Sequence, residues 1–149
     1  MPQSLSKIYV HLIFSTKNRE ARIHREWRPD LWAYLKGGLD GQGCFGIKVG
    51  GVADHVHALF ELHRTVAISD LVGEIKSEAT KWIKREHNEH LFSWQAGYGA
   101  FSVSASNLGE VADYISNQEA HHAEKDFKTE FRGFLEKHRV DYDERYVWD

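Results

Sequence analysis

The chain has 149 residues, the length of a single domain, which is enough to bury a hydrophobic core without disulfide bonds. Its 19 Lys and Arg against 22 Asp and Glu give a net charge of −3 and a pI near 6.4. Proteins that bind duplex nucleic acid usually carry a basic excess, so this balance argues against a bulk duplex binder.

Cysteine content and hydropathy bear on the compartment. Cys44 is the one cysteine, which excludes an internal disulfide and a four-cysteine zinc site and suits a reducing cytoplasm. No segment approaches the run of roughly 18 apolar residues that spans a membrane, and the first residues lack the order of a signal peptide. The sequence therefore predicts a soluble, cytoplasmic protein that does not contact a membrane.

The first half of the chain predicts strands and one helix. Residues 5–15 are rich in β-branched and aromatic types and apolar on both faces, as in a central strand. Apolar residues at four-residue spacing predict a helix over about 25–39: Trp27, Leu31, Leu35 and Leu39. A short apolar run over 44–49, a hairpin signal at Gly50-Gly51 and a strand over 53–62 predict an antiparallel pair.

The second half supplies another helix and a last strand. Residues 68–84 show the clearest helical periodicity, and 91–104 are aromatic and rich in β-formers. The order predicts an α+β core over 5–104, a ferredoxin-like split β-α-β-β-α-β arrangement with an antiparallel sheet. We interpret 1–149 as one domain without a linker, in which a helix over 107–123 and a C-terminal helix and docked tail over 125–149 follow the core.

His55 and His57 form the first candidate site. Strand side chains alternate faces, so both imidazoles project from one face while Val56 and its alternates enter a core. Asp54 can orient His55 or simply serve the preceding turn. Taken alone, His-x-His is as typical of an ordinary strand as of a metal site.

Tyr114 and Gln118 form the second candidate site. Leu108, Val111, Ala112 and Ile115 make a helical apolar stripe, and Tyr114 and Gln118, four residues apart, share another face one turn apart. Two imidazoles, an amide oxygen and a phenol are thus offered by two elements.

Asp-His-Val-His on a strand, followed by Tyr-x-x-x-Gln on a later helix, resembles the single-tyrosine HUH transposases of bacterial insertion sequences, including the REP-associated tyrosine transposases. Ser15-Thr16-Lys17-Asn18-Arg19 and Trp94-Gln95-x-Gly97-Tyr98 support the resemblance, which runs from residue 5 to about 125. It implies a metal-dependent enzyme that cleaves and rejoins single-stranded DNA at hairpin-containing element ends.

The resemblance also implies residue roles. Tyr114 would attack the DNA and form a 5′-phosphotyrosine, and His55, His57 and Gln118 would hold Mg²⁺ or Mn²⁺. It favours a homodimer in which His55 and His57 of one chain face Tyr114 and Gln118 of the other, although the REP-associated relatives allow a monomer. The alternative activity is that of a REP-associated nuclease acting on chromosomal palindromes.

Several residues are candidates for DNA contacts. Lys17 and Arg19 belong to one basic cluster and Lys76 to another, although a solvated charged face is the more common explanation for either cluster taken alone. Trp94 and Tyr98 can stack on bases or lie in the core. His121 and His122, one turn beyond Gln118, can contact DNA or metal, or end a helix in solvent.

Other readings of the sequence are weaker. Tyr142 and Tyr146 are rival nucleophiles, but neither is followed by Gln or His three or four residues later, as Tyr114 is by Gln118. His11 can face the active site, although a packed histidine at the edge of the core is the simpler expectation. A histidine-based nucleotide hydrolase needs a third alternate histidine where Leu59 stands, and Gly41–Lys48 lacks the hydroxyl residue of a phosphate loop. A noncatalytic nucleic-acid-binding domain remains the alternative from another class.

Overall fold

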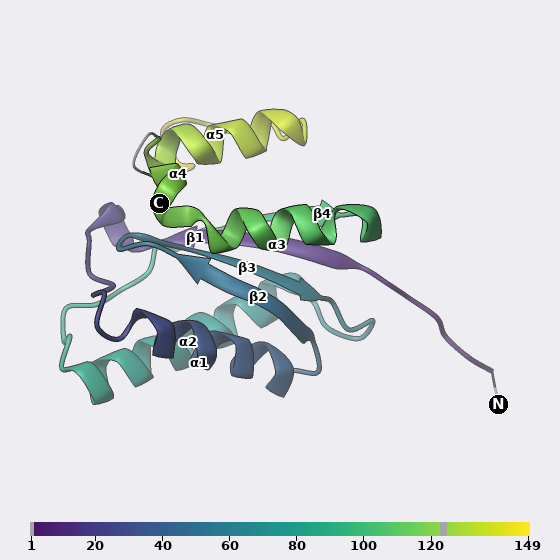
Figure 1. The fold of residues 1–149 in the computed structure, drawn as a ribbon, viewed down its shortest axis with the longest axis horizontal. Helices are drawn as coiled ribbons and strands as arrows, with labels where there is room; N and C mark the ends of the chain where they lie inside the picture. Colours follow the sequence, from purple (N-terminus) through teal and green to yellow (C-terminus); the bar gives the residue numbers. More distant parts are fainter. Residues whose placement is uncertain (1, 123–124) are drawn as a thin grey trace.

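The computed structural model describes residues 2–122 and 125–149. Within them, four strands form one antiparallel sheet in the order β2-β3-β1-β4 (Figure 1). The strands are β1 (Tyr9–Ser15), β2 (Phe45–Gly51), β3 (His55–Glu61) and β4 (Gly99–Val103). The helices are α1 (Arg28–Gly41), α2 (Ile68–His87), α3 (Leu108–Ser116), α4 (Gln118–His122) and α5 (Phe127–Lys137). Because α1 connects β1 to β2 and α2 connects β3 to β4, the predicted ferredoxin-like order is confirmed.

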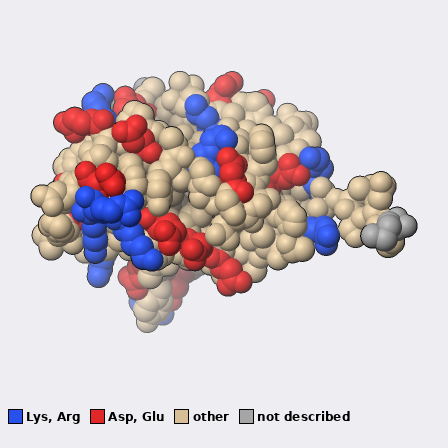
Figure 2. Space-filling model, turned by 90° about the horizontal axis from the view of Figure 1, so that it is seen from below, with Lys and Arg blue, Asp and Glu red and all other residues tan. Residues whose placement is uncertain are grey.

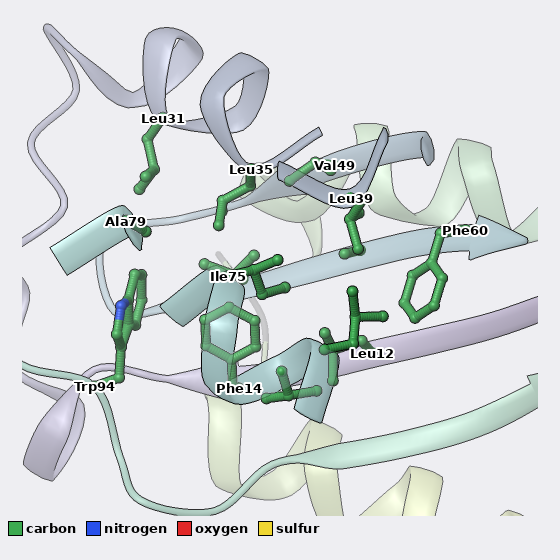
Figure 3. Close-up of a cluster of buried hydrophobic side chains, with 14 of the residues drawn as sticks. Leu12, Phe14, Leu31, Leu35, Leu39, Val49, Phe60, Ile75, Ala79 and Trp94 are labelled. Atoms are coloured by element: carbon green, nitrogen blue, oxygen red, sulfur yellow. The ribbon is translucent and has the colours of Figure 1, made fainter. Parts of the chain in front are cut away.

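One face of the sheet packs against α1 and α2 (Figure 1). Val10, Leu12 and Phe14 of β1 point to this face, because alternate residues of a strand share a side. They meet the helical stripes Leu31, Leu35 and Leu39 of α1 and Ile75 and Ala79 of α2 (Figure 3). Burying each of the large side chains contributes about 1.5–3 kcal/mol, so this layer fixes the sheet that carries the site.

The opposite face is covered by α3 and α5 (Figure 1). Phe127, Phe131 and Leu135 line one side of α5 and pack on Ile13 of β1 and Phe101 of β4. Helix α3 lies over β2, where Ile115 is its buried residue. Since β3 lies between β2 and β1, its side chains on this face fall between α3 and α5.

The connection between β2 and β3 differs from the sequence prediction. Gly50 and Gly51 belong to β2 rather than to a hairpin turn, and residues 52–54 make the turn. The reason is the helix that lies over β2: a Cβ on Gly50 would stand 2.8 Å from the carbonyl oxygen of Ile115 in α3. Gly50 therefore serves the close approach of α3, not a reversal of the chain.

The predicted helix over 107–123 is interrupted. Helix α3 ends at Ser116 and α4 begins at Gln118, with Asn117 between them at φ −102° and ψ 24°. Residue 123 of the predicted range lies outside the described residues. The predicted strand over 91–104 is likewise shorter, because only 99–103 pair along β1 and Trp94 makes an isolated bridge to Thr16.

The aromatic tail docks on α5, as its composition predicted. Tyr142, Val147 and Trp148 pack against the Phe127–Phe131 layer. The Arg19 guanidinium donates a hydrogen bond to the Trp148 carbonyl at 2.9 Å, and the Gly97 amide donates to the Asp149 carbonyl at 2.9 Å. The tail thereby ties α5 to the loops at one end of the sheet.

The surface over α1 and α2 carries Lys and Arg intermixed with Asp and Glu (Figure 2). This mixture agrees with the slightly acidic net charge and gives this face no continuous basic band. Among the helices of residues 2–122 and 125–149, none combines the length and apolarity that crossing a membrane requires.

Candidate active site

His55 and His57 stand on the face of β3 that α3 and α5 cover. Both are fully buried. The Nδ1 atom of His55 lies 2.7 Å from Asp54 Oδ1, and the Nδ1 atom of His57 lies 2.8 Å from His11 Nε2. These contacts fix both rings and turn both Nε2 atoms into the space between the helices.

The interruption at Asn117 brings Gln118 to the histidines. The Gln118 side-chain oxygen lies 3.1 Å from His55 Nε2, while its amide group donates to the Tyr114 carbonyl at 3.3 Å. Gln118 is 1% exposed. The Tyr114 ring lies 5.8 Å from the His57 ring, so the predicted phenol, amide and two imidazoles meet in one place.

Glu130 of α5 joins them, and sequence reasoning missed it. This carboxylate is 4% exposed and lies 3.0 Å from His57 Nε2 and 3.5 Å from His55 Nε2. Its other oxygen accepts a hydrogen bond from the Tyr114 hydroxyl and lies 3.2 Å from His122 Nε2. A signal existed in the sequence, because an acid directly before Phe131 in an apolar stripe is unusual in a helix facing a core.

The charges of the site follow from burial and from these contacts. Burial lowers the pKa of His57 to about 4, so this imidazole is neutral at pH 7. Burial alone would raise the pKa of Glu130, but hydrogen bonds from His122, His57 and Tyr114 outweigh it and hold that pKa well below its usual range. Burial and the bond to Glu130 raise the pKa of the Tyr114 phenol well above its ordinary value. At neutral pH the site holds a carboxylate and a protonated phenol.

His55, His57, His122 and Glu130 can hold a metal ion, because their ligand atoms all lie within 4.8 Å of one another. Gln118 adds an amide oxygen 3.0 Å from His122 Nε2 and 3.1 Å from His55 Nε2. Imidazole nitrogen and carbonyl or carboxylate oxygen are ordinary ligands of divalent metals. The residues present therefore fit a metal ion, and the predicted ligands His55, His57 and Gln118 are among them.

Comparison with known proteins decides the family. The model of the IS200-like transposases matches residues 4–118, which include both histidines, the tyrosine and the glutamine. The chain belongs to the IS200-like transposase family.

Two curated relatives in this family are transposases of the insertion sequence element IS200, from Salmonella typhimurium and Salmonella typhi. Each is 23% identical over 114 residues, which cover 72% of this chain and 74% of the relative. Among solved structures, a Deinococcus radiodurans protein assigned as a transposase is 22% identical with a TM-score of 0.62, covering 79% of this chain and 98% of that one. A REP-associated tyrosine transposase bound to a REP hairpin is 14% identical with a TM-score of 0.60, covering 82% and 73%. These structures share the fold of the IS200-like chain.

The residues predicted to contact DNA are spread over the IS200-like fold. Lys17 is exposed, and Arg19 binds the Trp148 carbonyl. Lys76 is buried, and its ammonium group donates to the carbonyls of Gln95 at 2.9 Å and Gly97 at 2.6 Å. Burial lowers the pKa of Lys76 to about 8. A hydrogen-bonding role within the fold is thus visible for Lys76, and its DNA contact stays a prediction.

The two aromatic candidates differ in exposure. Trp94 is 8% exposed and packs edge-on against Phe14 and Phe92 in the main core. Tyr98 is 37% exposed, and its ring lies 5.8 Å from the Lys76 ammonium group. Tyr98 is therefore the more exposed of the two rings, and stacking on a base stays a prediction for both.

The accessory and rival residues are also separated by the structure. His121 stacks on Tyr114 with ring centres 4.5 Å apart, whereas His122 reaches the carboxylate cluster. Tyr142 packs with the tail, and Tyr146 is 63% exposed. Among the described residues, Tyr114 is the tyrosine that the structure brings to the histidine pair.

Proposed function

We propose that this chain cleaves and rejoins single-stranded DNA with Tyr114 as the nucleophile. The observation that carries the proposal is the convergence of Tyr114 and Gln118 with His55 and His57 in a member of a transposase family. The phenol oxygen would bond to phosphorus as the bond from phosphorus to the 3′ oxygen breaks. This leaves a 5′-phosphotyrosine; the phenol proton goes to water, and the departing 3′ oxygen takes a proton from water to become a free hydroxyl. Because the phosphoester energy is conserved, a 3′-hydroxyl can later reverse the step without ATP.

The residues divide the work. His55, His57 and Gln118 would hold Mg²⁺ or Mn²⁺, which supplies polarisation of the phosphate and stabilisation of developing charge when bound. Asp54 and His11 orient the two imidazoles through their Nδ1 atoms. The phenol is reached through a cavity of about 320 Å³ whose lining includes Tyr114, Glu130, Lys125 and Lys137. Lysines beside that opening suit a phosphate backbone.

We further propose that the substrate is single-stranded DNA with a short hairpin. A protein with this fold was solved with a REP hairpin, and the mixed charges of this chain suit a local groove better than a duplex surface. An alternative substrate is a chromosomal REP-type palindrome. Cleavage of labelled element ends and of such palindromes, compared side by side, separates the two, and equal cleavage of blunt duplex would contradict both.

The test of the nucleophile uses a hairpin oligonucleotide and Mn²⁺. Wild-type protein should form a denaturation-resistant protein–DNA adduct that chelation prevents. Tyr114→Phe should abolish the adduct while hairpin binding persists, because one hydroxyl is removed. Tyr146→Phe is the matched control, since that tyrosine is 63% exposed. An adduct that persists in Tyr114→Phe would overturn the assignment and leave a noncatalytic DNA-binding domain or another nucleophile.

A homodimer in which α3 and α4 of one chain complete the site on the other chain stays a prediction. In the described chain, Gln118 lies 3.1 Å from His55 of the same chain, so an exchange would have to replace this contact with its equivalent from a partner. Mixing His57→Ala chains with Tyr114→Phe chains tests it. A shared site restores cleavage in heterodimers, whereas mixtures that stay inactive despite heterodimer formation show that each chain completes its own site.

A further inference from the structure

We propose that Glu130 and His122 are direct metal ligands, which makes the centre a five-donor site that binds Mn²⁺ more tightly than Mg²⁺. The donor cluster consists of His55, His57, Gln118, His122 and Glu130. Both added residues follow the segment that the family model matches, which ends at residue 118. The proposal deepens the proposed function, on which the catalytic use of the metal rests, but metal binding itself can be tested without DNA.

Donor atoms from three elements converge beside His55. Asp54 Oδ1 lies 2.7 Å from His55 Nδ1 and orients the ring so that its Nε2 atom faces the site. The Gln118 side-chain oxygen lies 3.1 Å from this Nε2 atom, and a Glu130 oxygen lies 3.5 Å from it. The Gln118 oxygen faces the histidines because its amide group donates to the Tyr114 carbonyl. Atoms of the types that bind divalent metals therefore meet in one buried space.

The distances between the donor atoms also fit one coordination shell. Metal–ligand bonds of about 2.0–2.2 Å place neighbouring donors about 3.0 Å apart in octahedral and about 3.4 Å apart in tetrahedral coordination. The contacts of Glu130 with His57, His122 and His55 measure 3.0, 3.2 and 3.5 Å. The contacts of Gln118 with His122 and His55 measure 3.0 and 3.1 Å. The donors are thus already spaced as the neighbours in one coordination shell are.

The fold also holds Glu130 in place. Phe127 and Phe131 on either side of it are buried against the sheet, and Asp126 caps the helix by accepting from the Thr129 amide. The ring of Trp148 in the tail lies within reach of the Lys128 and Arg132 side chains of the same helix, at 5.0 and 5.1 Å. Helix α5 is therefore held by the sheet on one side and by the tail on the other, and this packing places the Glu130 carboxylate beside the histidines.

Glu130 also connects the metal ligands to the nucleophile. One oxygen faces His55 and His57, and the other accepts the hydroxyl of Tyr114. A carboxylate held by a metal on one side would hold the phenol on the other. The C-terminal helix thereby sets the position of the tyrosine relative to the metal.

The donor types indicate which metal binds. Three imidazole nitrogens with one carboxylate and one amide oxygen suit Mn²⁺, Co²⁺ or Zn²⁺, whereas Mg²⁺ prefers oxygen ligands and retains several waters. We expect the wild-type chain to bind Mn²⁺ at least about tenfold more tightly than Mg²⁺.

The experiment measures Mn²⁺ and Mg²⁺ affinity of the full chain by calorimetry in the absence of DNA. Glu130→Gln and His122→Asn should each weaken Mn²⁺ binding at least about tenfold, the scale on which metal sites respond to loss of a supporting group. Glu136→Gln, an exposed acid on the same helix, and His90→Asn, an exposed histidine, are the controls and should bind Mn²⁺ as wild type does.

A measurement on the wild-type chain guards against variants that fail to fold. Zn²⁺ added to protein with nitrogen-15 histidine should shift the Nε2 resonances of His55, His57 and His122 and leave that of His90 unchanged. Wild-type Mn²⁺ affinity in Glu130→Gln or His122→Asn, equal affinity for Mg²⁺ and Mn²⁺, or an unshifted His122 would each overturn the proposal. If the five donors bind Mn²⁺ but no Tyr114–DNA adduct forms, the proposed function fails and the metal site stands. If the wild-type protein cleaves DNA but Glu130→Gln and His122→Asn bind Mn²⁺ as tightly as wild type does, the proposed function stands and the five-donor site fails.

Discussion

Gly50 controls how closely the tyrosine helix approaches the sheet, and Gly50→Ala tests whether that approach matters. An added Cβ would lie 2.8 Å from the carbonyl oxygen and 2.9 Å from the Cγ2 atom of Ile115. Carbon atoms in contact are normally about 3.5–4.0 Å apart, so α3 must retreat by roughly 0.6–1 Å. Ile115 is adjacent to Tyr114, so the retreat moves the proposed nucleophile away from His57.

Two effects of different size should follow. Overpacking of this kind costs about 1–3 kcal/mol of unfolding free energy, which leaves a folded protein. A displacement approaching 1 Å at a reacting group can lower a rate about a hundredfold, so cleavage should fall much more than stability does. The matched control is Gly73→Ala in α2, where a Cβ meets no atom within 4 Å and Ala should stabilise the helix by about 0.5–1 kcal/mol.

Urea unfolding and cleavage of a labelled hairpin oligonucleotide, measured on both variants, give the answer. Loss of cleavage in Gly50→Ala with the fold retained and with Gly73→Ala fully active is the expected result. A Gly50→Ala protein as stable and as active as the wild type would show that α3 does not rest on Gly50 during the reaction.

Two further predictions concern the stability of the metal-free protein. The pKa of His57 is lowered from 6.5 to about 4 in the folded chain. As pH falls from 6.5 to 4, His57 is therefore protonated in the unfolded chain but stays neutral in the folded chain. The free energy of unfolding should drop by up to about 3 kcal/mol over this range. The pKa of His122 is raised by Glu130 against the effect of burial, so protonation of His122 stabilises the folded chain as pH falls. Urea midpoints that rise on acidification would show that the contribution of His57 is not the larger one. Lys76→Met should cost about 1–3 kcal/mol because the buried carbonyl of Gln95 and the partly buried carbonyl of Gly97 lose their donor, while Lys81→Met, at a site 67% exposed, should change the urea midpoint little. Unchanged stability in Lys76→Met with weakened DNA binding would instead favour the DNA contact that the basic cluster suggested.

The elements that could be predicted from sequence are those whose burial is periodic. Leu31, Leu35 and Leu39 recur at helical spacing because α1 buries one side, and the alternation around Val56 follows from the pleat of β3. Where local and tertiary demands differ, local signals mislead. Gly50-Gly51 is typical of a turn, yet the approach of Ile115 from α3 determines why glycine stands there.

The charged side chains show the same limit. Lys76 belongs to a basic cluster in sequence, but its neighbours in space are backbone carbonyls, and no periodicity encodes them. The sequence allows two positions for His11, at the core edge or facing the active site; its side chain is packed at 2% exposure, and its ring bonds His57. Burial can be inferred from pattern, whereas the partner of a buried polar group depends on how distant elements dock.

Glu130 is an example of a buried polar group whose partners depend on how the elements dock. A carboxylate that is 4% exposed would be costly unless it were paired, and its partners come from β3, α3 and α4; His57 of β3 is 73 residues away in sequence. Those partners meet only because α3 and α5 cover the same face of the sheet on either side of β3. The histidine pair could therefore be found from a period of two and the Tyr–Gln pair from a period near four, but the group that joins them could be found only from the packing of α5. The residues that hold α5 against Ile13 and Phe101 thus determine the geometry of the candidate site as directly as its ligands do.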